Sequence, residues 1–186
     1  MESSRLVFVK IILMAFWYFT SILLASQGKV ISWGTQVIGE NLVGQYKSIS
    51  AGESFSVGLK NDNSLSGWGT NVNGDDVFVG LCNIPAPNAD FQMVSAGASH
   101  ILALKTGGSI VAWGDNLFGQ CNVPAPNSDF IAIAAGGFHS VGLKSDNTIV
   151  VWGHNGYGQG IVPAPNAGFV EIAAGWYHTL ARKSDN

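Results

Sequence analysis

Charged side chains are scarce in this chain of 186 residues, because Asp, Glu, Lys and Arg together make up only 11 % of it. The formal net charge is −3, and no run of Lys or Arg is longer than two residues. The electrostatic footprint of a nucleic-acid-binding protein is therefore missing, and we expect no nucleic-acid partner. Few charges and 24 glycines favour short buried strands joined by tight turns over long amphipathic helices.

A catalytic constellation is also missing from the sequence. The pairs Ser99-His100 and His139-Ser140 place a hydroxyl beside an imidazole, but no third orienting group or oxyanion hole accompanies them. No glycine-rich phosphate loop precedes a helix. We therefore predict that the protein is not an enzyme and that it has no cofactor.

Long apolar runs are confined to the N-terminus, where residues 6–25 carry a single charge, that of Lys10. The uncharged part, residues 11–25, is 15 residues long. A membrane-spanning helix needs about 20 apolar residues and a signal-peptide core about 7–15. We predict an apolar helix within residues 1–28 that is either a signal peptide or a membrane anchor through 6–25. In both cases the rest of the chain is secreted or held outside the cytoplasm.

What the remaining chain does contain is one unit that recurs at a step of 39 residues. The copies Phe91–Phe130 and Phe130–Phe169 follow each other directly, and a longer step of 45 reflects six inserted residues, Asp76–Leu81. The repeated positions are Gly52, Gly97, Gly136 and Gly175, then His100, His139 and His178, and Trp33, Trp68, Trp113 and Trp152. The repeat domain spans residues 29–186, with units at about 29–45, 46–90, 91–129, 130–168 and, incomplete, 169–186.

Each unit reads as a small antiparallel sheet. We expect strands at Phe130–Ala135, His139–Lys144 and Thr148–Trp152, a tight turn at Ser145–Asn147, and a short fourth strand near Ile161-Val162. The two prolines of each Pro-Ala-Pro-Asn segment lack amide donors, so that segment lies at an edge or outside the sheet. Such a sheet cannot bury both faces alone. Stacking of successive sheets around an axis, as in a β-propeller, would bury them.

The recurring histidines allow a metal site, but a structural role in hydrogen bonds to backbone is favoured, because Phe55 occupies the equivalent place in an earlier unit. We expect His154, which has no counterpart, to be exposed. The segment Asn71–Asp76 faintly resembles a calcium loop, although its spacing favours a polar turn. We predict no metal.

Two cysteines, Cys82 and Cys121, occupy equivalent places in successive units. Export would permit a disulfide, yet equivalent positions in neighbouring units are too far apart for the Cα separation of about 7 Å that a disulfide allows. We expect two small buried hydrophobic side chains, with a bridge as the alternative.

The repeat resembles that of the regulator of chromosome condensation. The residues that carry the resemblance are Ala135-Gly136, His139-Ser140, Gly142-Leu143-Lys144, Asp146-Asn147, Trp152-Gly153, Asn155 and Gly158-Gln159. The short step is similar to that of exported bacterial members. The resemblance implies a seven-bladed propeller, whereas this chain has about four units. We therefore expect an all-β partial or open arc of a larger propeller, with a small closed ring as the alternative.

The function we predict is an exported, non-enzymatic scaffold for protein binding, with a glycan as an alternative partner. The candidate binding loops carry Asp76, Phe78, Phe118, Tyr157 and Trp176, and Phe138 and Tyr177 lie in turns that would also cluster on the rims. The aromatic rings suit binding hot spots but equally suit packing on the next blade. The four repeated Trp residues are expected to pack. Two alternatives remain. One is a hydrolase or lyase on a propeller rim that uses Asp75, Asp76 or Asp115, and the other is guanine-nucleotide exchange by family analogy alone.

Overall fold

The computed structural model describes residues 46–184, which form eleven strands in four antiparallel sheets. The predictions for residues 1–28, for the unit at 29–45 and for Trp33 concern residues outside the described ones. Within 46–184, no helix is long and apolar enough to cross a membrane.

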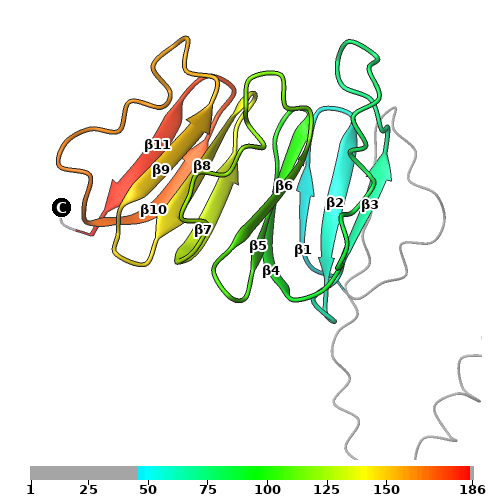
Figure 1. Cartoon of the computed structure of the whole chain (residues 1–186), viewed down its shortest axis with the longest axis horizontal. Coiled ribbons are helices and arrows are strands. Elements are labelled where there is room, and N and C mark those ends of the chain that lie inside the picture. Colours follow the sequence, from blue (N-terminus) through cyan, green and yellow to red (C-terminus); the bar gives the residue numbers. More distant parts are fainter. Residues whose placement is uncertain (1–45, 185–186) are drawn as a thin grey trace, which may run out of the picture.

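Each sheet forms one blade, and the blades follow one another in chain order (Figure 1). Blade 1 contains β1 (Tyr46–Ala51), β2 (Phe55–Lys60) and β3 (Leu65–Gly69). Blade 2 contains β4 (Phe91–Ala96), β5 (His100–Lys105) and β6 (Ile110–Gly114). Blade 3 contains β7 (Phe130–Ala135), β8 (His139–Lys144) and β9 (Ile149–Gly153), and blade 4 contains β10 (Phe169–Ala174) and β11 (Thr179–Lys183).

The strand predictions for the unit at 130–168 are confirmed for β7 and β8 and are wrong by one residue for β9, which runs from Ile149 to Gly153. Thr148 belongs to the turn, where its amide and hydroxyl both donate to Asp146 Oδ1, at 3.1 and 2.7 Å. Asn147 takes the left-handed backbone, with φ of 64°, that the tight turn requires. The suggested fourth strand at Ile161-Val162 is wrong, because these residues are in no strand.

The Pro-Ala-Pro-Asn segments lie outside the sheets, as predicted, and their asparagine extends each sheet edge with its side-chain amide. Asn127 accepts from the Ile110 amide at 2.7 Å and donates to the Ile110 carbonyl at 2.8 Å. The side chain therefore makes the two bonds that a paired residue would make, without needing the amides that proline lacks.

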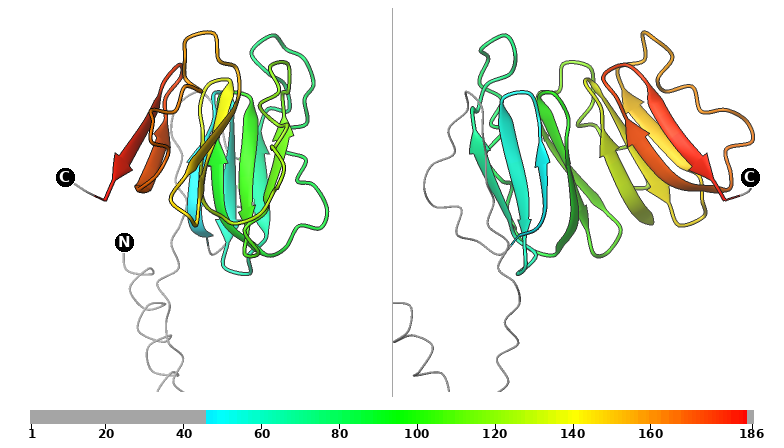
Figure 2. Two further views of the ribbon diagram at one scale, coloured as in Figure 1. Left: turned by 60° about the vertical axis from the view of Figure 1, so that its left-hand side comes forward. Right: turned by 180° about the vertical axis from the view of Figure 1, so that it is seen from behind.

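The blades stack face to face, and their first strands lie next to one another while the third strands spread apart. Three apolar clusters fill the structure, and each bridges two adjacent blades. Phe55 of β2 joins Ile101 of β5 in the first cluster, Leu102 of β5 joins Phe130 of β7 in the second, and Val141 of β8 joins Phe169 of β10 in the third. Figures 1 and 2 show blades 1 and 4 at opposite ends of the row. The described blades therefore form an open arc and not a small closed ring.

Candidate functional site

The turns and loops of the blades gather at two rims. In every blade the first strand ends, the second begins and, where a third is present, it ends at the same rim, because the strands pair in antiparallel register. We call this the loop rim. Its segments are 52–54, 97–99, 136–138 and 175–178 from the turns between first and second strands, and 70–83, 115–122 and 154–161 from the loops after the third strands.

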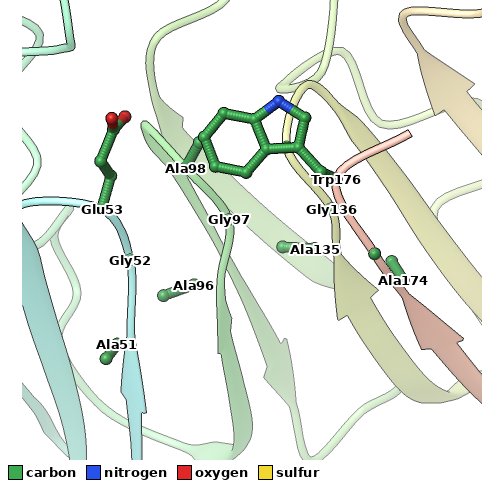
Figure 3. Close-up of a pocket in the computed structure, with 12 residues that line it drawn as sticks. Ala51, Gly52, Glu53, Ala96, Gly97, Ala98, Ala135, Gly136, Ala174 and Trp176 are labelled. Carbon is green, nitrogen blue, oxygen red and sulfur yellow. The ribbon is translucent and has the colours of Figure 1, made fainter. Parts of the chain in front are cut away.

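A groove with a volume of about 300 Å³ runs along the first strands at the loop rim. Its floor is built from the repeated Ala-Gly steps of four blades, and Figure 3 shows Glu53 at one end and Trp176 at the other. Backbone hydrogen bonds join the blades beneath it: Glu53 N donates to Ala98 O at 3.2 Å, and Ala98 N donates to Gly136 O at 3.4 Å. The groove is therefore a continuous surface that spans all four blades.

The repeated glycines belong to this floor and leave no room for a side chain. A Cβ on Gly97 would lie 2.4 Å from the carbonyl oxygen of Gly136 in the next blade and 2.4 Å from His100 Cε1. Gly52, Gly136 and Gly175 are hindered in the same way, each by the aromatic or imidazole ring three residues later. The close approach of successive blades thus depends on glycine at this position.

Two of the three repeated histidines occupy matching environments between blades. His100 Nε2 lies 2.9 Å from Ser140 Oγ, and that hydroxyl donates to the carbonyl of Gln120 at 2.8 Å. His139 Nε2 lies 3.0 Å from Thr179 Oγ1, which donates to the Gln159 carbonyl at 2.8 Å. These imidazoles connect one blade to a hydroxyl of the next.

Burial and the neighbouring His139 lower the pKa of His100 to about 4, and burial, with His178 and His154 nearby, lowers that of His139. Both rings are therefore neutral at pH 7. The third, His178, differs from the other two because it is exposed. Among the described residues, no His, Cys, Asp and Glu side chains group in a way that could hold a metal ion.

The repeated tryptophans pack between blades. Trp113 Nε1 donates to Leu81 O at 3.1 Å, and Trp152 Nε1 donates to Gln120 O at 2.8 Å, so each anchors to the loop of the preceding blade. Trp68 is half-buried, and its Nε1 has no hydrogen-bond partner among the described residues.

Both cysteines are free, so the alternative of a disulfide between them is wrong, and they are half-buried where buried side chains were expected. Each thiol donates to a backbone carbonyl, Cys82 to Thr70 at 3.5 Å and Cys121 to Asp115 at 3.3 Å. Burial, with the carboxylate of Asp115 nearby, raises the pKa of the Cys121 thiol to about 12.

The candidate aromatic residues of blades 2, 3 and 4 come together on the loop rim in what we call the aromatic patch. Its members, in the order of their contacts, are Phe118, Phe138, Trp176, Tyr177, Tyr157 and His154. Ring contacts with centroid separations of 4.8 to 6.2 Å join each member to the next and return to the first. Phe118, Phe138, Tyr157, Trp176 and Tyr177 were predicted to lie in turns on the rims, whereas His154 was expected only to be exposed. His154 is instead half-buried, between Phe118 and Tyr157.

The patch remains open to solvent although its rings touch one another. Tyr157 is 71 % exposed, and Trp176 and Phe118 are 44 % and 43 % exposed. Phe78, in the inserted loop of blade 1, is 67 % exposed but is not in these ring contacts. Among the predicted binding residues, the structure therefore brings Phe118, Tyr157 and Trp176 together and leaves Phe78 and Asp76 in another blade.

In the oxygen-rich segment Asn71–Asp76, the side-chain amide oxygens accept hydrogen bonds from amides of the same loop. Asn71 Oδ1 accepts from the Cys82 amide at 2.6 Å, and Asn73 Oδ1 accepts from the amides of Asp75 and Val77 at 3.1 and 3.0 Å. Asp115, the third carboxylate considered for catalysis, accepts from the Gln120 side chain at 3.2 Å. These contacts hold the loops in shape.

Comparison with known proteins identifies the class. The model for the regulator of chromosome condensation (RCC1) repeat matches residues 46–75, 94–120 and 130–159, so three units of the chain are repeats of this family of β-propeller proteins. Among curated proteins, none matches the chain.

Three solved structures illustrate the likeness. The ectodomain of the Arabidopsis thaliana receptor kinase ACR4 is 29 % identical, with a TM-score of 0.58 over 76 % of this chain and 46 % of that one. The ectodomain of the Physcomitrella patens receptor kinase CR4 is 25 % identical, with a TM-score of 0.62 over 77 % and 39 %. Prp20p from Saccharomyces cerevisiae, at 22 % identity, has a TM-score of 0.62 over 76 % and 42 % and supports the fold alone. The chain thus spans less than half the length of each.

Proposed function

We propose that this chain is an exported, non-enzymatic scaffold whose loop rim binds another protein. The observation that carries the proposal is the aromatic patch, in which six rings hold one another in place while Tyr157 stays 71 % exposed. Aromatic side chains that are fixed before binding lose little conformational freedom in a complex, and they dominate many interface hot spots. Contiguous exposed apolar surface of this kind is typical of interaction sites.

Propeller proteins of similar fold support a protein partner in general terms. Prp20p is described with binding properties toward Gsp1p and histones, and it has also been crystallised with Kap60. A repeat scaffold of this type holds variable turns on an invariant framework, which is how such proteins present binding surfaces.

Export rests on a different line of support. Residues 6–25 are apolar with one charge, and two of the similar structures are receptor-kinase ectodomains. Fractionation of cells that express a C-terminally tagged chain tests this part. We expect the tag in the medium or on the outer membrane face, and a tag found only in the cytoplasm would contradict export.

Site-specific photo-crosslinking tests the binding role. A photoreactive amino acid placed at Tyr157 should yield a defined crosslinked protein. The same amino acid placed at Ser145, exposed in a turn of the opposite rim, should not yield it.

A matched pair of variants then distinguishes binding by the aromatic patch from non-specific binding by any exposed apolar side chain. Trp176→Ser removes a patch ring, whereas Ile131→Ser removes an exposed apolar side chain of β7, itself 48 % exposed. The crosslink from position 157 should be lost in the first variant and retained in the second. Equal crosslinking in both, or crosslinking to many proteins from both rims, would contradict the proposal.

A further inference from the structure

The two rims differ in charge, and this difference bears on the partner of the proposed function. All the Lys and Arg residues of the described chain lie at or near the rim opposite the loop rim: Lys47, Lys60, Lys105, Lys144, Arg182 and Lys183. Acidic residues accompany them there, so that rim carries both signs. The loop rim, by contrast, has four carboxylates and no Lys or Arg among its described segments. The carboxylates are Glu53, Asp75, Asp76 and Asp115.

Several basic side chains of the opposite rim are committed to structural contacts. Lys105 Nζ lies 3.8 Å from the ring centroid of Phe91 and donates to the Pro87 carbonyl at 3.0 Å. Lys144 makes the equivalent contacts, with the Phe130 ring at 4.8 Å and the Pro126 carbonyl at 3.2 Å. The separation of charge between the rims is therefore a fixed property of the fold.

The carboxylates and the aromatic patch meet through the groove. Glu53 lines one end of it and Trp176 the other (Figure 3). Glu53 also approaches the inserted loop, since its Oε2 lies 3.6 Å from where a Cβ of Gly74 would be. Asp75 and Asp76 follow directly and are exposed. One extended ligand along the groove can therefore meet aromatic rings at one end and carboxylates at the other.

We propose that the loop rim takes a cationic, arginine-bearing polypeptide segment as its ligand. This assignment rests on the proposed binding function and names the chemistry of the partner. Guanidinium groups stack on aromatic rings and pair with carboxylates, so one side-chain type satisfies both ends of the groove. An acidic segment would face four carboxylates with no opposing cation, which disfavours it. Neutral glycans would leave those charges unused.

Fluorescence anisotropy with labelled peptides of alternating Arg-Gly, Lys-Gly and Glu-Gly, added to the full-length protein, tests the assignment. The Arg-Gly peptide should bind most tightly, the Lys-Gly peptide more weakly because lysine stacks less well, and the Glu-Gly peptide not at all. Added salt should weaken the binding. No binding of the Arg-Gly peptide, or equal binding of the Glu-Gly peptide, would overturn the assignment. Binding of neutral oligosaccharides at this rim in place of peptides would do the same.

Variants that each remove one carboxylate charge or one ring localise the peptide-binding site. Glu53→Gln and Asp76→Asn should each lower the affinity for the Arg-Gly peptide about two- to fivefold, as for exposed ion pairs. Trp176→Ala should lower it about tenfold. Asp90→Asn, at an exposed carboxylate of the opposite rim, should leave it unchanged. Equal effects of Asp90→Asn and Glu53→Gln would show non-specific attraction and refute the site. If crosslinking from position 157 succeeds while cationic peptides fail, the binding function stands and this assignment falls.

Discussion

The junction between blades 1 and 2 and the junction between blades 2 and 3 occupy equivalent places but differ in chemistry. At the first, Phe55 and Ile101 are both buried, with exposures of 3 % and 0 %. At the second, the same two positions hold His100 and Ser140, which are hydrogen-bonded at 2.9 Å. A histidine in one blade is thus paired with a hydroxyl side chain in the next blade, and a phenylalanine is paired with an isoleucine. The repeat requires a matched pair, not histidine itself.

The largest expected loss of stability comes from substituting the repeated glycine, which both kinds of junction share. Gly97→Ala would place a Cβ 2.4 Å from the Gly136 carbonyl oxygen, so the backbones of two blades must separate. We expect a loss of about 3 kcal/mol in the free energy of unfolding, measured by urea titration. Gly107→Ala is the control, because nothing lies within 4 Å of its Cβ position. Equal losses in the two variants would show that close approach is not what selects glycine.

Acid should affect the two junctions differently. The pKa of His100 falls from 6.5 to about 4 in the folded chain, mainly because the ring is buried. The unfolded chain therefore takes up a proton first, and stability present above pH 6.5 is lost as the pH falls toward about 4, by on the order of 3 kcal/mol. His139 acts in the same direction. The variant His100→Phe/Ser140→Ile copies the apolar junction, so urea titrations across this pH range should show a smaller loss of unfolding free energy than in the wild type. An unchanged loss would contradict the assignment of the acid sensitivity to His100.

Introducing the polar pair at the apolar junction tests the matching rule. Phe55→His alone buries an imidazole nitrogen opposite Ile101, which offers no hydrogen bond, and should cost about 2 kcal/mol. Adding Ile101→Ser supplies the hydroxyl and should recover about 1 kcal/mol of that loss. The coupling energy from this double-mutant cycle is the measured quantity. Strict additivity of the two changes would mean that the positions do not act as a pair.

A smaller effect on stability is expected from substitution of Cys121. The pKa of its thiol is raised to about 12, so the folded protein should react slowly with alkylating reagents at pH 8 and rapidly once unfolded in urea. Cys121→Gly, which copies the residue at the equivalent position of the next unit, Gly160, should cost less than about 1 kcal/mol. Rapid alkylation of the native protein would contradict the burial of this thiol.

The sequence was sufficient to predict the architecture because the repeat makes its own periodicity visible. The strands, the tight turns and the proline segments each follow from local chemistry that recurs between units, and the turn is Asp-Asn at 62–63 and 146–147 and Gly-Gly at 107–108. The shift of β9 by one residue reflects Thr148, whose hydroxyl bonds to Asp146 in the turn, a competition that β propensity alone does not reveal.

The candidate site was harder to predict than the fold. The ring contacts of Phe138 with Trp176 and of Tyr157 with Tyr177 join blades 3 and 4, so they depend on how these two blades stack. The pairing of Phe55 with Ile101 is visible in the sequence once the register between blades is known. That register depends on which face of each strand meets the next blade, and the order of residues along one unit does not specify it.

The central claim is that the repeated positions build the fold while the loop rim supplies the function, and one variant tests both halves. Tyr157→Ser/Trp176→Ser removes two exposed rings of the aromatic patch. We expect its free energy of unfolding to stay within about 1 kcal/mol of the wild type, while crosslinking from a photoreactive residue at Phe118, also in the patch, is lost. A large loss of stability with the crosslink retained would mean that the patch is packing between blades and not a binding surface.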